Sequence, residues 1–151
     1  MIDYFDASAI AAILLSERQG GRVADALQAS DAGIVVSEFC VAETSSAISR
    51  LFRMKERSRE QADELLLDVD RWVEATADIV DVVSEDFTRT TELVRHLDLK
   101  LRAPDALHLA IAERLEARLI TLDTNLHAAA IAAGVRSYNP AEADAPGDPK
   151  D

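Results

Sequence analysis

Short apolar runs alternate with segments of helical periodicity along almost the whole chain. The runs are rich in β-branched residues and are bounded by polar or turn-forming positions, which predicts strands at 2–5, 33–37, 79–83, 118–122 and 135–139. Between them, apolar residues recur at intervals of three and four, which predicts helices in each connection. Strands that alternate with helices in this way form a mostly parallel sheet covered on both faces, so we expect an α/β fold.

The helix boundaries carry their own signals. Two glycines at 20 and 21 are expected to stop the first helix, and a second helix should cover about 22–30. Ser58 and Gln61 have the spacing of a capping box, which predicts the start of a long helix that runs to about Ala77. Further helices are expected at 38–52, near 85–97 and over 101–115, and Gly134 should cap a last helix that ends at Ala133.

Composition fits one globular domain with a distinct C-terminal tail. The chain has 151 residues, of which 48% are hydrophobic and 29% charged, and this length suffices to bury a sizeable core. The segment from Asn139 onward contains three of the four prolines, interleaved with acids. We therefore expect a domain over residues 1–139 and a flexible, acidic, proline-rich tail over 140–151.

The N-terminal residues and the cysteine count predict a cytoplasmic protein. The sequence begins MIDYFDAS, with no basic region before an apolar stretch, and the early run AIAAILL is too short to span a bilayer. The single cysteine, Cys40, has no partner for an internal disulfide, which is typical of a reducing compartment.

The protein is strongly acidic, but one segment of the sequence is rich in basic residues. A net charge of −12 argues against a general nucleic-acid binder. Within residues 50–59, however, the sequence RLFRMKERSR places five bases around a single Glu. Such a run is typical of a solvated surface that complements a helix C-terminus. Contact with RNA phosphates is the alternative, for which the candidates are Arg50, Arg53 and Lys55.

Four acids occupy positions where a parallel sheet could gather them. Ligands bind outside the carboxyl ends of the strands in such sheets, and Asp6 and Asp123 directly follow the first and fourth predicted strands. Each also suits an ordinary role as a helix N-cap. Glu43 lies within a helix, where an edge position reaching water is common, and Asp105 follows Pro104 in a first helical turn, where the helix dipole favours an acid.

Taken together, these segments resemble the PIN domain, and specifically the VapC-type toxins of toxin–antitoxin pairs. The resemblance covers residues 2–138 and is carried by YFDASAI, VAETSSAISR, LRAPDALHLAIA and LITLDTNLHAAAIAAGV in that order. The most specific pieces are D-x-S at 6–8, PDALHLA at 104–110 and T-x-D at 121–123. The resemblance implies a three-layer α/β/α sandwich whose five-stranded sheet has the order 3-2-1-4-5.

The resemblance also implies a metal-dependent ribonuclease site. By it, four acids share one pocket and bind Mg²⁺, for which Mn²⁺ can substitute: Asp6, Glu43, Asp105 and Asp123. Asp6 is the expected central ligand, completed by Asp105 and Asp123, while Glu43 holds ions through water or positions the nucleophile. Three further residues match positions that bond metal-bound water or the carboxylates: Ser8, Thr121 and, more weakly, Asn125. His108 matches a common family residue, and we expect it to be structural, bonded to a neighbour on its own helix.

The chemistry explains the choice of acids. A phosphodiester is already negative and gains charge as water attacks, so a divalent cation must lie between it and the carboxylates. Mg²⁺ prefers oxygen ligands and keeps several waters, so a few carboxylates with substrate oxygens form a sensible set. The expected products are a 5′-phosphate and a 3′-hydroxyl.

Partners follow from the same resemblance. The expected substrate is RNA of the tRNA or rRNA class, and the expected regulator is a VapB-type antitoxin whose Arg reaches the carboxylates. A homodimer and a toxin–antitoxin hetero-oligomer are expected. We expect no membrane contact, and DNA contact only through the antitoxin.

Three alternatives remain open at this stage. A haloacid-dehalogenase-type phosphotransferase would also place Asp6 after the first strand, but it expects a second Asp where this chain has Ser8. A receiver-type signalling module shares the alternating pattern, yet it needs a Lys after its last strand, and VRSYN provides none. The third alternative is a catalytically silent PIN-fold module that binds RNA or protein; its natural signature would be a lost acid.

Overall fold

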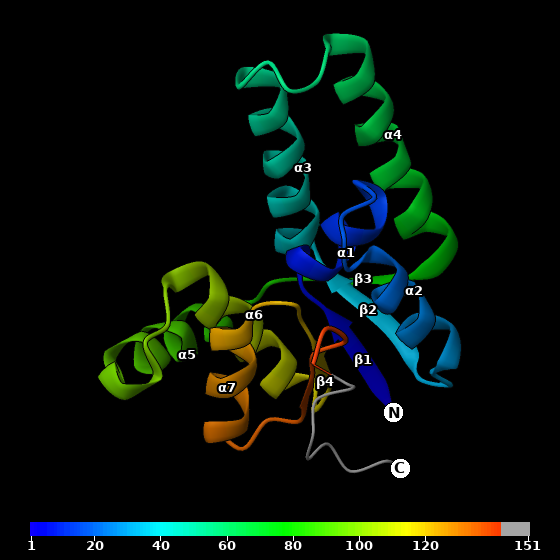
Figure 1. The fold of residues 1–151 in the computed structure, drawn as a ribbon. Helices are drawn as coiled ribbons and strands as arrows, with labels where there is room; N and C mark the ends of the chain where they lie inside the picture. The colour runs from blue at the N-terminus through cyan, green and yellow to red at the C-terminus, as the bar shows by residue number, and fades with distance from the viewer. Residues whose placement is uncertain (143–151) are drawn as a thin grey trace.

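One parallel sheet organises the molecule. The computed structural model describes residues 1–142, and its five strands lie in the order β3-β2-β1-β4-β5 (Figure 1). Every neighbouring pair is parallel. The strands are β1 Ile2–Phe5, β2 Gly33–Ser37, β3 Asp78–Val80, β4 Arg118–Ile120 and β5 Ser137–Tyr138. The strand order implied by the resemblance is therefore confirmed.

Helices cover both faces of this sheet. The α-helices are α1 Ala7–Leu14, α2 Gly20–Ala29, α3 Glu38–Arg53, α4 Arg59–Thr76, α5 Ser84–Arg95, α6 Ala103–Arg114 and α7 Thr124–Ala132, with a short 3₁₀ helix at Leu97–Leu99. Helices α1 to α4 pack on one face and α5 to α7 on the other, as Figure 1 shows. The expected three-layer α/β/α architecture is confirmed.

Strand residues divide between two cores because successive side chains point to opposite faces. Tyr4 packs in the core beneath α5, α6 and α7, whereas its neighbour Phe5 packs in the core beneath α1 to α4. Leu119 and Ile120 alternate in the same way on β4. Central strands buried on both faces account for the continuous apolar runs in the sequence.

The register of the sheet positions the candidate acids. Phe5 pairs with Ile120, so the residues after these two strands emerge side by side. The Asp6 amide donates to the Ile120 carbonyl at 3.2 Å, which places Asp6 next to Thr121 at the carboxyl edge. Helix α3 begins directly after β2 at the same edge and brings Glu43 on its second turn.

Some predicted boundaries were wrong, for identifiable reasons. Gly20 and Gly21 begin α2, whereas α1 already ends at Leu14. Gly20 lies against the preceding helix, where an added Cβ would be 2.3 Å from the Ala12 carbonyl oxygen. The close approach explains the need for glycine there. The glycine that was predicted to stop the first helix is therefore required by packing between α2 and α1.

Strands β3 and β5 at the sheet edges are shorter than predicted. The apolar run 79–83 gives a strand only at Asp78–Val80, since the Val83 amide is bound by Asp86 at the start of α5. The run 135–139 gives only Ser137–Tyr138. Residues 140–142 of the expected tail form a turn against Asn139, and the remainder of that tail lies outside the described residues.

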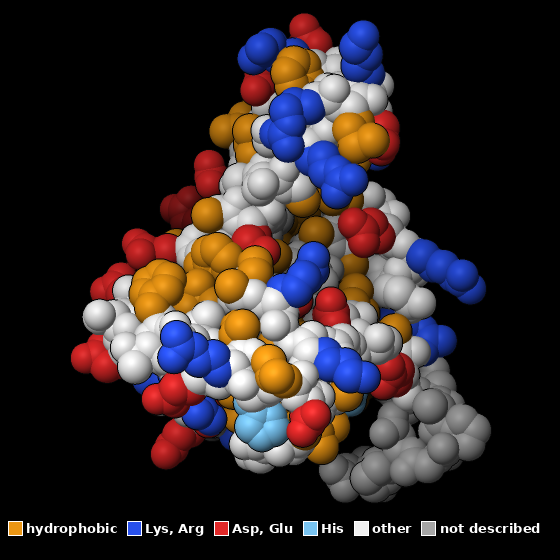
Figure 2. Space-filling model, turned by 90° about the vertical axis from the view of Figure 1, so that its left-hand side faces the viewer, with side chains coloured by type: hydrophobic (Ala, Val, Ile, Leu, Met, Phe, Trp, Pro, Cys, Tyr) orange, Lys and Arg blue, Asp and Glu red, His pale blue; other side chains and the backbone are white. Residues whose placement is uncertain are grey.

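Helices α3 and α4 form a hairpin that projects from the layered body (Figure 1). The capping box at its second helix is present, with the Ser58 hydroxyl accepting from the Gln61 amide and the Gln61 side chain accepting from the Ser58 amide. Lys and Arg side chains gather at the hairpin tip in Figure 2. The exposed bases of this region, hereafter the basic tip, are Arg50, Arg53, Lys55, Arg57 and Arg59.

Among the helices of residues 1–142, none is both long enough and apolar enough to cross a membrane.

Candidate active site

Asp6 is the most buried of the four candidate acids. It follows β1 as the N-cap of α1, and its Oδ1 accepts a hydrogen bond from the Ala9 amide at 3.1 Å. Its side chain is only 3% exposed. The capping role anticipated from the sequence is therefore present, yet a single cap does not account for a nearly buried carboxylate at the edge of the sheet.

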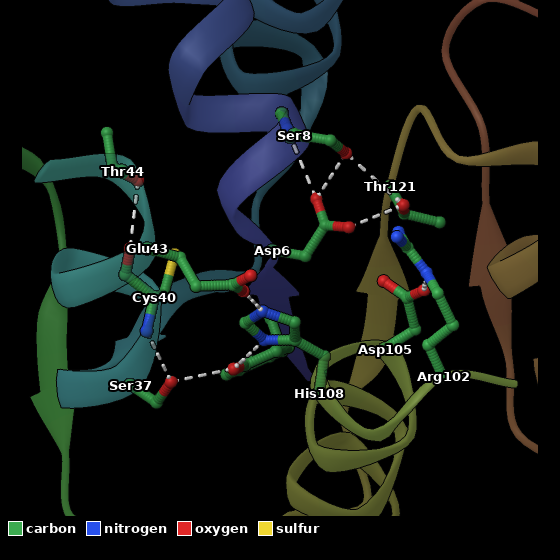
Figure 3. A network of polar contacts seen from close by, with 12 residues as sticks. Asp6, Ser8, Ser37, Cys40, Glu43, Thr44, Arg102, Asp105, His108 and Thr121 are labelled. Carbon is green, nitrogen blue, oxygen red and sulfur yellow. Dashed lines mark hydrogen bonds and ion pairs between the residues drawn. The ribbon is translucent and has the colours of Figure 1, made fainter. Parts of the chain in front are cut away.

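Two hydroxyls hold both oxygens of the Asp6 carboxylate. Ser8 donates to Oδ1 at 2.6 Å, and Thr121 donates to Oδ2 at 2.6 Å across the β1–β4 junction (Figure 3). Ser8 Oγ also accepts from the Leu122 amide, and Thr121 Oγ1 accepts from the Asp123 amide, both at 3.0 Å. The hydroxyls thus orient Asp6 rigidly. The hydrogen bonds of Ser8 and Thr121 to the carboxylate are present, whereas their expected role toward metal-bound water stays a prediction.

Glu43 reaches the same edge from α3 and is bound there by His108. The imidazole Nε2 of His108 lies within hydrogen-bonding distance of the Glu43 carboxylate. Its Nδ1 lies 2.7 Å from the Tyr4 hydroxyl, which in turn is 2.8 Å from the Ser37 hydroxyl. His108 therefore bonds to residues of α3 and β1, and the expectation that it bonds a neighbour on its own helix is wrong.

Asp105 and Asp123 border the site from α6 and α7. Asp105 lies in the first turn of α6, with its side chain 19% exposed and 3.6 Å from the Arg102 guanidinium. Asp123 is the N-cap of α7 and accepts from the Leu126 amide at 2.8 Å. Figure 3 shows Glu43 and Asp105 on opposite sides of His108, with Asp6 above them. Side chains from four different elements thus approach one edge.

The electrostatics show that this edge is unfavourable for uncompensated negative charge. Burial raises the pKa of the Asp6 carboxyl, against the opposing influence of His108 and of the Ser8 and Thr121 hydrogen bonds. Burial also raises the pKa of Asp105, and the negative charge of Asp123 adds to that effect. Asp6 acts on Asp105 in the same direction. Asp6 and Asp123 are therefore close enough to Asp105 to disfavour its ionisation.

The donor chemistry of these residues fits a hard divalent cation. Carboxylate oxygens are the ligands that Mg²⁺ and Mn²⁺ prefer. A cation would also relieve the repulsion by Asp123 that adds to the effect of burial on the pKa of Asp105. Within residues 1–142, no three His, Cys, Asp or Glu side chains are already arranged to hold a metal ion together. The acids therefore surround the edge without forming a ready-made ligand cage.

The remaining predicted residues bond to other parts of the chain or lie along the α3–α4 hairpin. Asn125 is exposed, and its amide donates to the Lys100 carbonyl at 2.9 Å, a contact that fixes the loop before α6. Its expected role toward the acids stays a prediction. Arg50 and Arg53 lie seven and ten residues after Glu43 on α3, or roughly 10 and 15 Å along the helix axis. Lys55 follows in the exposed turn at the hairpin tip.

Sequence reasoning missed two polar residues of this site, Tyr4 and Ser37. Both are fully buried. Ser37 appeared as the last residue of a predicted strand, and Tyr4 appeared in the first predicted strand and in the segment YFDASAI. A buried tyrosine hydroxyl needs a hydrogen-bond partner, so Tyr4 near the end of a central strand was the available signal. Ser37 was likewise readable as the N-cap of α3, which its contact with the Cys40 amide confirms.

Comparisons with known proteins agree with this architecture. The model of the PIN domain family matches residues 4–132. A search of curated proteins gave no match.

Three solved structures with this fold illustrate the relationship. The VapBC2 complex of Rickettsia felis, bound to a promoter DNA fragment, aligns with a TM-score of 0.69 at 19% identity, over 92% of this chain and 98% of the other. FitAcB from Neisseria gonorrhoeae aligns with a TM-score of 0.72 at 18% identity, over 93% of this chain and 98% of the other. VapC20 of Mycobacterium tuberculosis is a toxin that cleaves the sarcin-ricin loop. It aligns with a TM-score of 0.67 at 18% identity, over 84% of this chain and 94% of the other. At these identities the likeness establishes the fold.

Proposed function

The chain belongs to the PIN domain family, and from that premise we propose that it is a Mg²⁺- or Mn²⁺-dependent endoribonuclease that serves as the toxin of a toxin–antitoxin pair. The observation that carries the proposal is the buried Asp6 carboxylate, oriented by Ser8 and Thr121 beside Asp105 and Asp123. A helix cap alone needs neither this burial nor the neighbouring acids.

Each residue has a distinct part in the proposed reaction. Asp6, Asp105 and Asp123 would hold the cation, and Ser8 and Thr121 keep the Asp6 oxygens aimed in one direction. A bound divalent cation supplies charge stabilisation for the phosphate and a more acidic water. Because the Asp6 carboxylate is already ordered, little reorganisation is needed when substrate binds.

Glu43 has the geometry of a proton acceptor. One of its carboxylate oxygens faces His108, and the side chain is 32% exposed, so the other oxygen is available to an attacking water. We assign it the positioning of that water and acceptance of its proton as the phosphodiester is cleaved. The products would carry a 5′-phosphate and a 3′-hydroxyl.

The proposed partners follow from the family and from the charge at the edge. Single-stranded segments of a tRNA or rRNA are the proposed substrate, because RNA of this kind offers accessible phosphates. An antitoxin Arg is a suitable inhibitor, since a guanidinium binds carboxylates in bidentate fashion. The proposed assemblies are a homodimer and a hetero-oligomer with a VapB-type antitoxin, through which any DNA contact would be made.

A cleavage assay with matched variants tests the proposal. Purified full-length protein is incubated with total tRNA and rRNA in Mg²⁺, in Mn²⁺ and in EDTA. We expect cleavage with either cation, none in EDTA, and background activity for Asp6→Asn. Asp70→Asn, the same chemical change at an exposed position of α4, should cleave like the wild type. Binding of RNA without cleavage under all these conditions would instead identify a silent PIN-fold module.

A further inference from the structure

His108 occupies an enclosed position between three elements. It lies on α6, is 2% exposed, and has the rings of Phe39 and Tyr4 at 5.2 and 5.8 Å between centroids. These neighbours restrict the imidazole, so both ring nitrogens must be satisfied by fixed partners. Those partners are the Tyr4 hydroxyl at Nδ1 and the Glu43 carboxylate at Nε2.

The contacts around Ser37 define the direction of the hydrogen bonds. Ser37 Oγ accepts from the Cys40 amide at 3.0 Å, and its own hydroxyl hydrogen has the Tyr4 oxygen, at 2.8 Å, as its acceptor. Tyr4 then uses its hydrogen to donate to His108 Nδ1 at 2.7 Å. If Tyr4 instead donated to Ser37, the Ser37 hydrogen would lack an acceptor among the described contacts of a fully buried side chain.

This direction determines which nitrogen of the imidazole carries the proton. A neutral imidazole has one N–H, and Nδ1 is occupied as an acceptor from Tyr4, so the proton lies on Nε2. That N–H faces Glu43. The chain of donors from Ser37 through Tyr4 to His108 therefore ends at the carboxylate that the proposed reaction uses.

We propose that His108 is the positioning residue for Glu43, with its donating tautomer set by Tyr4 and Ser37. The inference rests on the proposed function and deepens it, because it assigns a task to a residue that is bonded to Glu43 and Tyr4 and is not itself one of the four acids. Tethering one Glu43 oxygen leaves the other in a defined place. Misplacing a reacting group by about 1 Å can cost on the order of 10²-fold in rate.

The first test is spectroscopic and needs no activity. The protein has three histidines, so the ring ¹⁵N signals of His108 can be assigned with His96→Gln and His127→Gln. At mildly alkaline pH, wild-type His108 should show a protonated Nε2 and an unprotonated Nδ1. Tyr4→Phe keeps the ring but removes the donor, and it should give a mixture of tautomers. A protonated Nδ1 in the wild type would overturn the inference.

The second test separates positioning from structural support. His108→Leu should lower kcat by about 10²-fold with little change in KM, whereas His108→Gln, which retains an N–H donor, should recover most of that rate. In a Glu43→Gln background the His108→Leu change should have almost no further effect, because both act through one carboxylate. Losses that multiply in the double variant, or a fully active His108→Leu, would overturn the proposal.

The two tests distinguish this inference from the proposed function. A wild-type protein that cleaves no RNA contradicts the proposed function, and the inference is then decided by the tautomer of His108 alone. A wild-type protein that cleaves RNA but fails either test contradicts the inference and leaves the proposed function intact. Should His108→Leu fail to fold, the tautomer of His108 in the wild type and in Tyr4→Phe decides the inference.

Discussion

At the scale of single residues, burial of the ionised Asp6 carboxylate is energetically unfavourable for the folded protein. Its side chain is 3% exposed, and its pKa is raised chiefly by burial. The raised pKa means that the folded state favours the protonated form. Any favourable contribution of Asp6 to folding is thus complete below the ordinary carboxyl value of 3.8 and is lost as the pH rises through the folded-state pKa.

Replacing Asp6 should therefore stabilise the protein while abolishing its activity. In EDTA at neutral pH we expect Asp6→Asn to have a higher Tm than the wild type, because the amide carries no charge to bury. For a chain of this size, 1 kcal/mol corresponds to roughly 2–4 °C. Thermal denaturation followed by circular dichroism measures the difference.

The pH dependence gives this prediction its control. The advantage of Asp6→Asn should shrink as the pH approaches 3.8, where the wild-type carboxyl becomes protonated in both folded and unfolded states. Asp70→Asn, at an exposed position, should leave Tm almost unchanged at all pH values. A neutral-pH Tm of Asp6→Asn at or below that of the wild type would argue against a costly buried charge.

Residue-level reasoning from the sequence succeeded where strand ends determine position. Asp6 and Asp123 follow predicted strands, so their place at the carboxyl edge could be derived before any coordinates. The hydrogen-bond partners of His108 could not be derived in this way, because Tyr4 and Glu43 lie 104 and 65 positions away in the sequence. Helical spacing describes neighbours on one helix only, and contacts between elements depend on how those elements pack.

At the scale of elements, an ion pair secures α6, the helix that carries Asp105 and His108. Asp86 lies in the first turn of α5, is 1% exposed, and accepts from Arg114 of α6 at 2.7 and 2.9 Å. The same carboxylate accepts from the Val83 amide at 3.0 Å. One side chain thus caps α5 and ties it to the end of α6. The contact adds a polar link between α5 and α6 to the apolar packing of α6 in the core.

Removing the Arg114 side chain should destabilise the protein because it leaves the buried Asp86 carboxylate unpaired. We expect Arg114→Ala to lower the free energy of unfolding by about 3 kcal/mol, measured by urea denaturation with an unchanged m value.

Arg71→Ala is the matched control for this variant. Its side chain is 71% exposed and lies 3.7 Å from Asp68 on the same helix, so its removal should change the stability by at most about 0.5 kcal/mol. Equal losses in the two variants would show that the buried pair contributes no more than a surface pair.

Element boundaries were less predictable than element order. The capping box at Ser58 is encoded locally, so the start of α4 was readable from four residues. The end of β3 was not, since Val82 and Val83 look like strand residues but precede the Asp86 cap. The start of α2 was equally unpredictable, because Gly20 is required by its close approach to Ala12 and not by the end of α1. Such boundaries are decided by packing, which no local pattern records.

At the scale of the whole molecule, positive charge is concentrated at one place on an acidic protein. The net charge is −12, yet the basic tip carries five exposed bases on the projecting hairpin (Figure 2). A polyanion approaching this molecule is repelled by most of its surface and attracted by the tip. Helix α3 extends from this tip back to Glu43, so it would link the proposed RNA-binding surface with the acidic edge.

Charge removal at the tip should weaken RNA binding in a salt-dependent way. In the uncleaving Asp6→Asn background, Arg50→Ser with Arg53→Ser should reduce affinity for single-stranded RNA. The slope of log affinity against log salt should fall by about 0.7 for each RNA phosphate that the variant no longer neutralises. Fluorescence anisotropy over a series of salt concentrations measures both quantities.

A second pair of arginines provides the comparison for this experiment. Arg71→Ser with Arg95→Ser removes the same charge from exposed positions away from the tip. We expect the slope of this variant to match that of the parent protein. If the two pairs behave alike, the tip bases act only through net charge and are the solvated surface that their sequence also suggests.

The overall fold was predictable because alternation of strands and helices admits few arrangements. It required a parallel sheet between two helical layers, and both layers are present. The strand order came from the family resemblance, because periodicity does not say which strands are neighbours. The acids are spread over more than a hundred positions, so only the complete topology brings them to one edge.

The central place of β1 has a consequence for biosynthesis. The first strand emerges early from the ribosome, but its neighbour β4 follows only at Arg118–Ile120, and Asp6 finds Thr121 across 115 positions. The nascent polypeptide therefore cannot assemble the acidic edge until nearly all of it has been translated. The nuclease activity proposed for this chain would therefore be absent during most of its own synthesis.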